Sequence, residues 1–85
     1  MTPTEIQLLA TLKAPAVPLN EVCDRYLGLG SAHAMREAAL NRLPFPTFRL
    51  ATSRKAPVMV NISDLARHID QQHESAKRSW VNSQV

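Results

Sequence analysis

Apolar residues recur at helical spacing in the first part of the chain. The segment Thr2-Pro3-Thr4-Glu5 has the spacing of a capping box with proline at the first helical position, so a helix is expected to begin there. Pro15 disfavours a helical conformation at the residue before it and so limits the length of this helix. The pattern predicts a helix over residues 3–13, whose apolar stripe comprises Ile6, Leu8, Leu9 and Leu12.

A second and a third helix are predicted on either side of a glycine turn. Pro18 confines any strand before them to a sheet edge, and Asn20 is a candidate N-cap for a helix over residues 20–27. Gly28 ends this helix, and Ser31 is expected to cap the next one, over residues 32–41. Two helices joined by a short glycine turn are typical of a helix-turn-helix motif. The apolar face of the first of them comprises Leu19, Val22, Cys23, Tyr26 and Leu27.

Polar residues gather on one side of the predicted helix 32–41, while Met35, Ala38 and Ala39 are expected to face the core. In the major groove of DNA, Arg pairs with guanine and Asn with adenine through two hydrogen bonds each, so this helix is a candidate recognition helix. The alternative is an ordinary solvated face with one Arg-Glu pair. The candidate DNA-binding residues are Ser31, His33, Arg36, Glu37, Asn41 and Arg42.

The spacing changes from helical to alternating after the break at Leu43-Pro44-Phe45-Pro46. Residues 47–50 and 58–62 alternate polar and apolar around a central loop, which predicts a β-hairpin over residues 47–62. A last helix is then expected over residues 63–79, with Ser63 as its cap. Its apolar stripe reaches Trp80, which is either a packing lid or, as we favour slightly, a contact for a second subunit.

The uncompensated positive charge of the chain lies on the predicted hairpin. The chain has 10 Lys and Arg against 7 Asp and Glu, and the acids and bases balance in residues 1–48 and again in residues 56–85. A basic hairpin beside a helix-turn-helix is typical of a wing that contacts phosphates or the minor groove. Alternatively, the charges protect an exposed hairpin edge from aggregation. The candidate wing residues are Arg49, Thr52, Ser53, Arg54 and Lys55.

Length and composition limit the class of protein. A chain of 85 residues with 45% hydrophobic residues predicts one small globular domain, and the predicted helices and hairpin make its class α+β. The lack of any long apolar run predicts no membrane span and a cytoplasmic location. The single Cys23 forms no internal disulfide and is expected to be an inert core thiol. His68 and His73 do not converge on a helix, so we expect no catalytic residues, no metal site and no cofactor.

A run of residues in the central part of the chain carries a family resemblance: Pro18-Leu19, Val22-Cys23, Tyr26, the block from Leu43 to Leu50, Ser53, Lys55-Ala56-Pro57, Val60, Asp64-Leu65-Ala66 and Ile69-Asp70. Over roughly residues 17–72 the chain resembles the pyocin activator protein family. That family comprises small bacterial and prophage transcription regulators, so the resemblance implies DNA binding and activation of prophage or bacteriocin genes. The family usually has Gln where Arg54 stands, so a base-reading or phosphate-binding role of this position is expected to differ in this chain.

The expected architecture is a winged helix-turn-helix similar to that of MerR-type regulators and phage excisionases, preceded by an N-terminal helix and followed by a longer C-terminal helix. The alternative functions are therefore an excisionase that bends DNA for an integrase, or a protein-binding adaptor that uses the fold without DNA. The partners expected are double-stranded DNA in the nucleoid and further copies of the chain, as a dimer or a head-to-tail array. RNA polymerase is a further partner if the chain is an activator, and an integrase if it is an excisionase.

Overall fold

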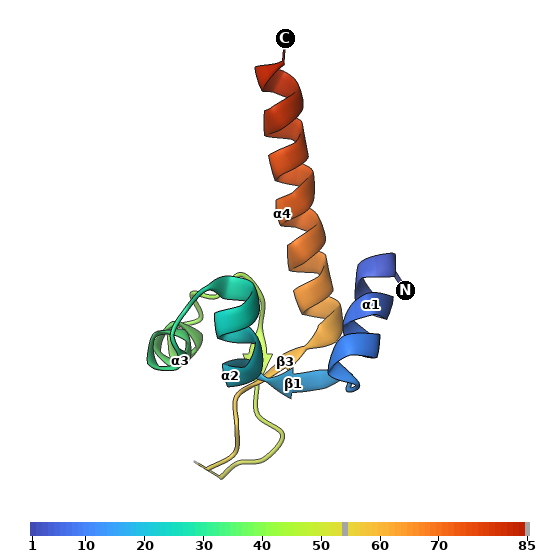
Figure 1. The fold of residues 1–85 in the computed structure, drawn as a ribbon. Helices are drawn as coiled ribbons and strands as arrows, with labels where there is room; N and C mark the ends of the chain where they lie inside the picture. The colour runs from blue at the N-terminus through green and yellow to red at the C-terminus, as the bar shows by residue number, and fades with distance from the viewer. Residues whose placement is uncertain (54, 85) are drawn as a thin grey trace.

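The computed structural model describes residues 1–53 and 55–84, and its elements are drawn in Figure 1. The described residues form four α-helices and a small antiparallel sheet of three strands, which confirms the expected α+β class and is compatible with a winged helix. The helices are α1 (Pro3–Leu12), α2 (Leu19–Val22), which continues as a π-helical turn η1 (Cys23–Leu27), α3 (Ser31–Ala39) and α4 (Ile62–Ser83). The strands are β1 (Ala16–Pro18), β2 (Thr47–Phe48) and β3 (Met59–Asn61).

The strand β3 occupies the centre of the sheet, with β1 and β2 antiparallel on its two sides. Because Pro18 has no N–H for a second neighbour, its position in an edge strand is the one that the sequence predicted. Two backbone hydrogen bonds continue the pairing: Leu19 N–H donates to the Val58 carbonyl at 2.7 Å, and Ile62 N–H donates to the Pro15 carbonyl at 2.9 Å. The sheet therefore fixes the residues at which α2 and α4 begin.

The hydrophobic core lies where the first turns of α4, the sheet and α2 meet. Leu19, Val60 and Leu65 come from these three elements, and each has no exposed surface. The helix α1 packs along the first half of α4 (Figure 1), where the Thr4 hydroxyl donates a hydrogen bond to the Asp70 carboxylate. The buried apolar residues that complete the core are Leu8, Val17, Val22, Cys23, Ala34, Ala38, Phe45, Val58, Ile62 and Ala66.

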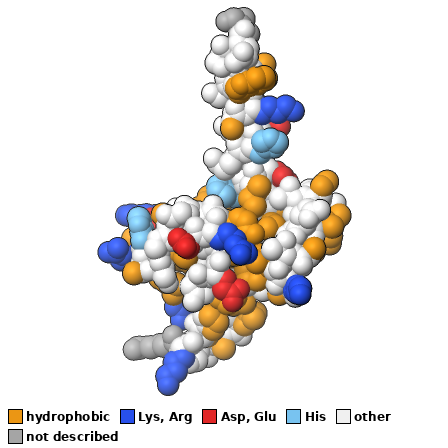
Figure 2. Space-filling model, viewed as in Figure 1, with side chains coloured by type: hydrophobic (Ala, Val, Ile, Leu, Met, Phe, Trp, Pro, Cys, Tyr) orange, Lys and Arg blue, Asp and Glu red, His pale blue; other side chains and the backbone are white. Residues whose placement is uncertain are grey.

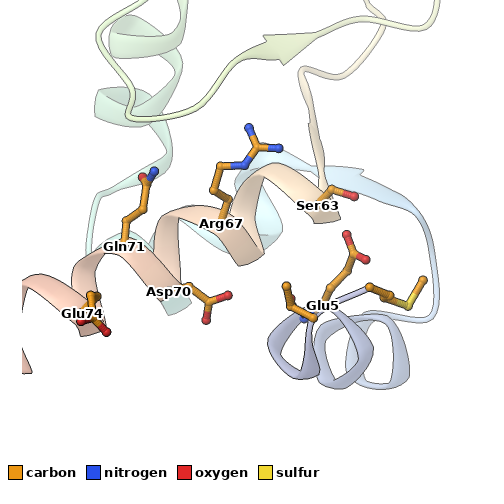
Figure 3. A pocket seen from close by; sticks show the side chains of 8 residues that line it. Glu5, Ser63, Arg67, Asp70, Gln71 and Glu74 are labelled. Atoms are coloured by element: carbon orange, nitrogen blue, oxygen red, sulfur yellow. The ribbon is translucent and has the colours of Figure 1, made fainter.

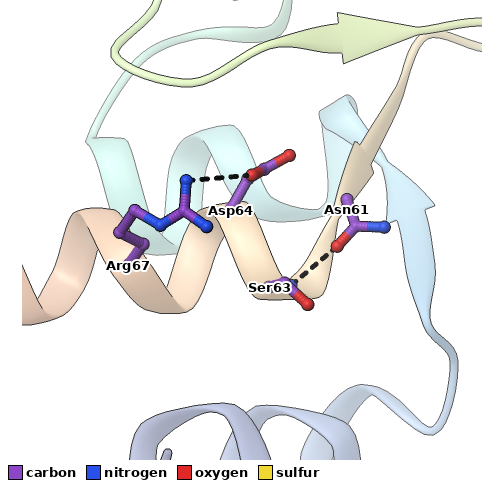
Figure 4. A network of polar contacts seen from close by, with 4 residues as sticks. All are labelled: Asn61, Ser63, Asp64 and Arg67. Carbon is purple, nitrogen blue, oxygen red and sulfur yellow. Dashed lines mark hydrogen bonds and ion pairs between the residues drawn. The ribbon is translucent and has the colours of Figure 1, made fainter. Parts of the chain in front are cut away.

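The helix α4 begins at the sheet and extends well beyond the core. Its first turn is capped by Asn61, whose Oδ1 accepts a hydrogen bond from Ser63 N–H at 2.8 Å, and Arg67 lies 3.9 Å from Asp64 in the same turn (Figure 4). Every described residue from position 71 onward is exposed, and Figure 1 shows this part of the helix projecting away from the body. Among the described residues, no helix combines the length and apolar content that crossing a membrane requires.

Three predicted helix caps are wrong, two of them for a common reason. The helices α2 and α4 begin directly after paired strands, with Pro18 and Asn61 in the capping positions that we assigned to Asn20 and Ser63. The cap of α3 is Gly30, and Ser31 is already the first helical residue, with no side-chain cap bond. The last strand residue, rather than the best local capping residue, decides where α2 and α4 begin. By contrast, Thr2 accepts from Glu5 N–H at the start of α1 as predicted.

Helix α3 is shorter and turned differently from the prediction over residues 32–41. It ends at Ala39, and Asn41 adopts a left-handed conformation with φ of 55°, so Asn41 and Arg42 follow the helix rather than belong to it. Ala34 faces the core and is buried, whereas Ala39, which we expected to face the core, is exposed. Two further boundaries also differ: the hairpin ends at Asn61 rather than at residue 62, and α4 reaches Ser83 rather than residue 79.

Candidate nucleic-acid interface

Small buried residues hold α3 close to the rest of the body. Ala34 has no exposed surface and Ala38 is 8% exposed, and this face of α3 packs against α2. The turn between the helices is tight because Gly28 adopts a φ of 67°, a conformation that costs most other residues free energy. The opposite face of α3 is therefore presented to solvent on a short and well-anchored helix.

Arg36 is the exposed base at the centre of that face. The neighbouring carboxylate of Glu37 is partly buried and lies 3.5 Å from the Nε2 of His33, one turn earlier. Among the ion pairs formed by the described residues, none includes Arg36. The Arg-Glu pair that we considered as the alternative is thus absent from the described part of the chain, and the guanidinium group of Arg36 is available for a ligand.

The residues that follow α3 bring it next to the hairpin. Arg42 is exposed, and its N–H donates to the Glu37 carbonyl at 2.8 Å, which closes the helix end. Asn41 and Arg49 line one hollow of about 180 Å³ between α3, the strand β2 and Val58. Two polar residues that lie eight positions apart in the chain are thereby placed on the same surface. Phe48, 36% exposed, forms part of the same hollow.

The hairpin loop is shaped by its own polar groups. A guanidinium nitrogen of Arg49 donates to the Ala56 carbonyl at 3.3 Å, across the base of the loop. The Ser53 hydroxyl accepts from Lys55 N–H at 3.2 Å, and the Ser53 carbonyl accepts from Ala56 N–H at 3.1 Å. Thr52 and Lys55 are exposed at the tip, whereas Arg54 lies outside the described residues. Ser53 therefore has a structural role in the loop that the sequence analysis did not anticipate.

One residue at this surface was missed because we had assigned it another role. Asn20 was interpreted as a helix cap, but α2 begins one residue earlier, so Asn20 lies within the helix and is exposed. It lines a small hollow of about 150 Å³ together with Ser31 and Pro57, between the helix pair and the hairpin. The location of Asn20 at this surface follows from the strand pairing of residues 16–18, which sets the start of α2. No local pattern in the sequence predicts that pairing.

The two basic elements form one side of the molecule. Figure 2 shows Lys and Arg side chains over α3 at one edge and over the hairpin loop at the lower end. Arg36 and Arg42 come from α3 and the segment after it, and Arg49 and Lys55 come from the hairpin. The one carboxylate among the candidate residues, Glu37, faces His33. The surface as a whole is therefore electropositive and suited to a polyanion.

A larger hollow between α1 and α4 has the opposite character. Its volume is about 630 Å³, and Figure 3 shows Glu5, Asp70 and Glu74 among its lining residues with Arg67 as the one base. Three carboxylates against one guanidinium repel phosphate, so this hollow is not part of a nucleic-acid surface. The described residues contain no group of three or more His, Cys, Asp or Glu side chains that could hold a metal ion.

Comparison with known protein families identifies the chain. The family described as "Pyocin activator protein PrtN" matches residues 4–76, which include most of α1, the helix pair, the hairpin and α4 as far as Ala76. The chain belongs to the pyocin activator family. The match extends the resemblance seen in residues 17–72 to most of the N-terminal helix, which the resemblance had not covered. Searches of the curated proteins and of the solved structures found no match to this family member.

Proposed function

We propose that this member of the pyocin activator family is a sequence-specific DNA-binding protein that activates transcription of pyocin or related prophage genes. Family membership supports a regulator of pyocin genes rather than an enzyme. The observation that carries DNA binding is the common surface of α3 and the hairpin, on which Arg36, Arg42 and Lys55 are exposed. In this proposal the helix pair and the hairpin act as a winged helix-turn-helix, in the nucleoid of the cytoplasm.

In this proposal α3 enters the major groove and the hairpin contacts the flanking backbone or the minor groove. Arg36 reads a guanine, because it is exposed at the middle of a helix whose other face is locked against α2. Asn41 lies beyond the helix in a left-handed conformation, so its contact is to the sugar-phosphate backbone rather than to a base in register with Arg36. Ser31, His33 and Arg42 flank the reading position.

The first test separates base reading from general attraction. Arg36→Ala is expected to weaken binding to the natural operator by about 1 to 3 kcal/mol and binding to random duplex much less. Arg78→Ala, which removes the same charge from the projecting part of α4, is the matched control and should change neither affinity appreciably. Competition binding on both duplexes measures the two losses. Equal losses on operator and random DNA for Arg36→Ala would rule out base reading.

The second test concerns the hairpin. If Lys55 neutralises one phosphate, Lys55→Ala should reduce the slope of log K against log salt by about 1, on specific and random duplexes alike. The same change is expected for Arg54→Ala, whereas Arg78→Ala should leave the slope unchanged. Titrations at several salt concentrations give the slopes. If Lys55→Ala and Arg54→Ala leave the slope unchanged, the charges of the hairpin protect its edge from aggregation. If Arg36→Ala also leaves the affinity for DNA unchanged, the chain is an adaptor that does not bind DNA.

A further inference from the structure

Beyond the hollow that Gln71 and Glu74 line together with α1, the projecting part of α4 packs against none of the other described elements. Residues 71–84 are all exposed and extend about 20 Å at 1.5 Å per residue. A helical segment of this length is marginal in water without packing, and it carries Trp80 at 64% and Val81 at 47% exposure. We propose that this segment pairs antiparallel with the same segment of a second copy of the chain.

An apolar stripe on α4 continues the line of its core residues into solvent. Ile69, His73, Ala76 and Trp80 fall within an arc of about 60° at 3.6 residues per turn. Ile62 and Leu65, which are buried in the core, lie on the same side of the helix. The surface that the body covers in the first half of α4 is therefore uncovered in the second half, and a partner helix lying on the stripe covers it again.

The side chains of the stripe are complementary to those of a second copy when the two helices run antiparallel. With Trp80 placed against the partner's Ile69, Ala76 lies against the partner's His73, so that a large residue meets a smaller one at every level. Ala76 permits close approach of the two helices near the symmetry axis. In a parallel pair, by contrast, Trp80 meets Trp80 and Ala76 meets Ala76, so that large and small side chains no longer face each other across the contact.

Charge along α4 favours the same orientation. Asp70 and Glu74 lie nearer the body and Lys77 nearer the tip, and all three are on one flank of the stripe. In the antiparallel register, Lys77 of one copy is level with position 72 of the other, between the two carboxylates. Arg78 points to the opposite side of the helix, about 160° from Trp80, and takes no part in the contact. Because a two-fold axis relates the two copies, the Lys77 of each copy lies between the two carboxylates of the other.

The body offers a surface for the tip of the partner's helix. A hollow of about 410 Å³, lined mainly by apolar groups, lies between α1 and η1, with Leu8 on one side and Tyr26 on the other. Figure 2 shows hydrophobic side chains exposed over this region, at the foot of the projecting helix. In the antiparallel register the end of the partner's α4 passes beside this region, which extends the contact beyond the helix pair itself.

The expected contact is modest in size. Burial of a Trp side chain removes about 150 to 250 Å² from water, so the two copies of Trp80 supply about a third of the roughly 1,200 Å² in a small specific interface. We therefore expect a dimer that dissociates on dilution. Because Trp80 is the single tryptophan of the chain, its fluorescence reports this association directly.

The test compares two charge reversals one residue apart in the full chain, without DNA, so that its outcome is independent of the proposed function. Sedimentation and tryptophan emission are measured over a wide range of protein concentration. The natural chain should dimerise, with emission moving to shorter wavelength as Trp80 becomes buried. Lys77→Glu should raise the dissociation constant at least about tenfold, whereas Arg78→Glu should leave it within about twofold. A chain that stays monomeric throughout, or equal effects of both reversals, would overturn the proposal.

Two further variants test the partner residues and the orientation. Combining Glu74→Lys with Lys77→Glu should recover part of the lost association, because an attraction across the interface is restored. Mixing His73→Cys with Ala76→Cys chains under oxidation should give more cross-linked dimer than either chain alone, since these positions face each other only in the antiparallel pair. Preferential cross-linking of each variant to itself would instead indicate a parallel pair. Circular dichroism of every variant shows that the helix is retained.

Discussion

The two halves of α4 carry the same periodic pattern and have opposite surroundings. In the first half, Ile62, Leu65 and Ala66 are at most 2% exposed, because α1, α2 and the sheet surround them. In the second half, Ala76 and Trp80 continue the stripe and are exposed. Periodicity in a sequence thus indicates a helix and its apolar face, but it does not tell what covers that face. Where the periodic pattern continues beyond the core, the apolar stripe of α4 is exposed to solvent.

The largest effect is expected in the covered half. Leu65→Ala removes a side chain with no exposed surface and should lower the free energy of unfolding by about 2 to 5 kcal/mol, as a cavity in the core does. Urea denaturation at a protein concentration low enough to keep the chain monomeric gives the value. A decrease of less than about 1 kcal/mol in the free energy of unfolding would show that the core repacks around the smaller side chain. The two halves of α4 would then not differ in how much their side chains contribute to folding.

An intermediate effect is expected at the boundary. Ile69 is half-buried against the core and is also the first residue of the exposed stripe. Ile69→Ala should cost the monomer about 1 to 2 kcal/mol, roughly half of what full burial contributes, and should also weaken dimerisation. Denaturation and sedimentation of the same variant separate the two losses. If only the monomer is affected, the partner helix does not reach this level of α4.

The smallest effect on folding is expected at the tip. Trp80→Ala should change the free energy of unfolding of the monomer by no more than about 0.5 kcal/mol, because Trp80 is largely exposed on the part of α4 that lies outside the core. The same substitution should abolish dimerisation in sedimentation experiments. Circular dichroism replaces fluorescence as the folding probe, since the variant lacks tryptophan. A loss above about 1 kcal/mol at low concentration would mean that Trp80 packs within its own chain.

Much of the fold follows from local signals. The helix after Thr2, the edge position of Pro18, the glycine turn and the hairpin are each encoded by a few adjacent residues whose conformational preferences are strong. Thr2 can accept from the Glu5 N–H, and Gly28 adopts a positive φ that the turn needs. These preferences act within a few residues, so a single sequence is enough to read them.

The remaining features depend on contacts between distant segments. Asn20 and Ser63 are good capping residues, but the pairing of β1 with β3 places the helix starts elsewhere. Asn41 was placed on the recognition helix because nothing before Leu43-Pro44 forbids helix, whereas the chain leaves α3 earlier to reach the strand β2. The sequence therefore predicted the helix and the hairpin as elements, but it placed Asn41 and Arg42 on a helix that ends at Ala39.

The position of β3 also has a consequence for synthesis of the chain. Both β1 and β2 pair with this strand, and Ala16 finds its partner only in Asn61. A nascent chain that has emerged as far as the hairpin loop contains α1, α2, α3 and the residues of β2, but it has no sheet, and Val17 and Leu19 lack the core residues that β3 and α4 supply. Long-range pairing of this kind is slow relative to helix formation. The sheet can therefore form only after the residues of β3 have been synthesised.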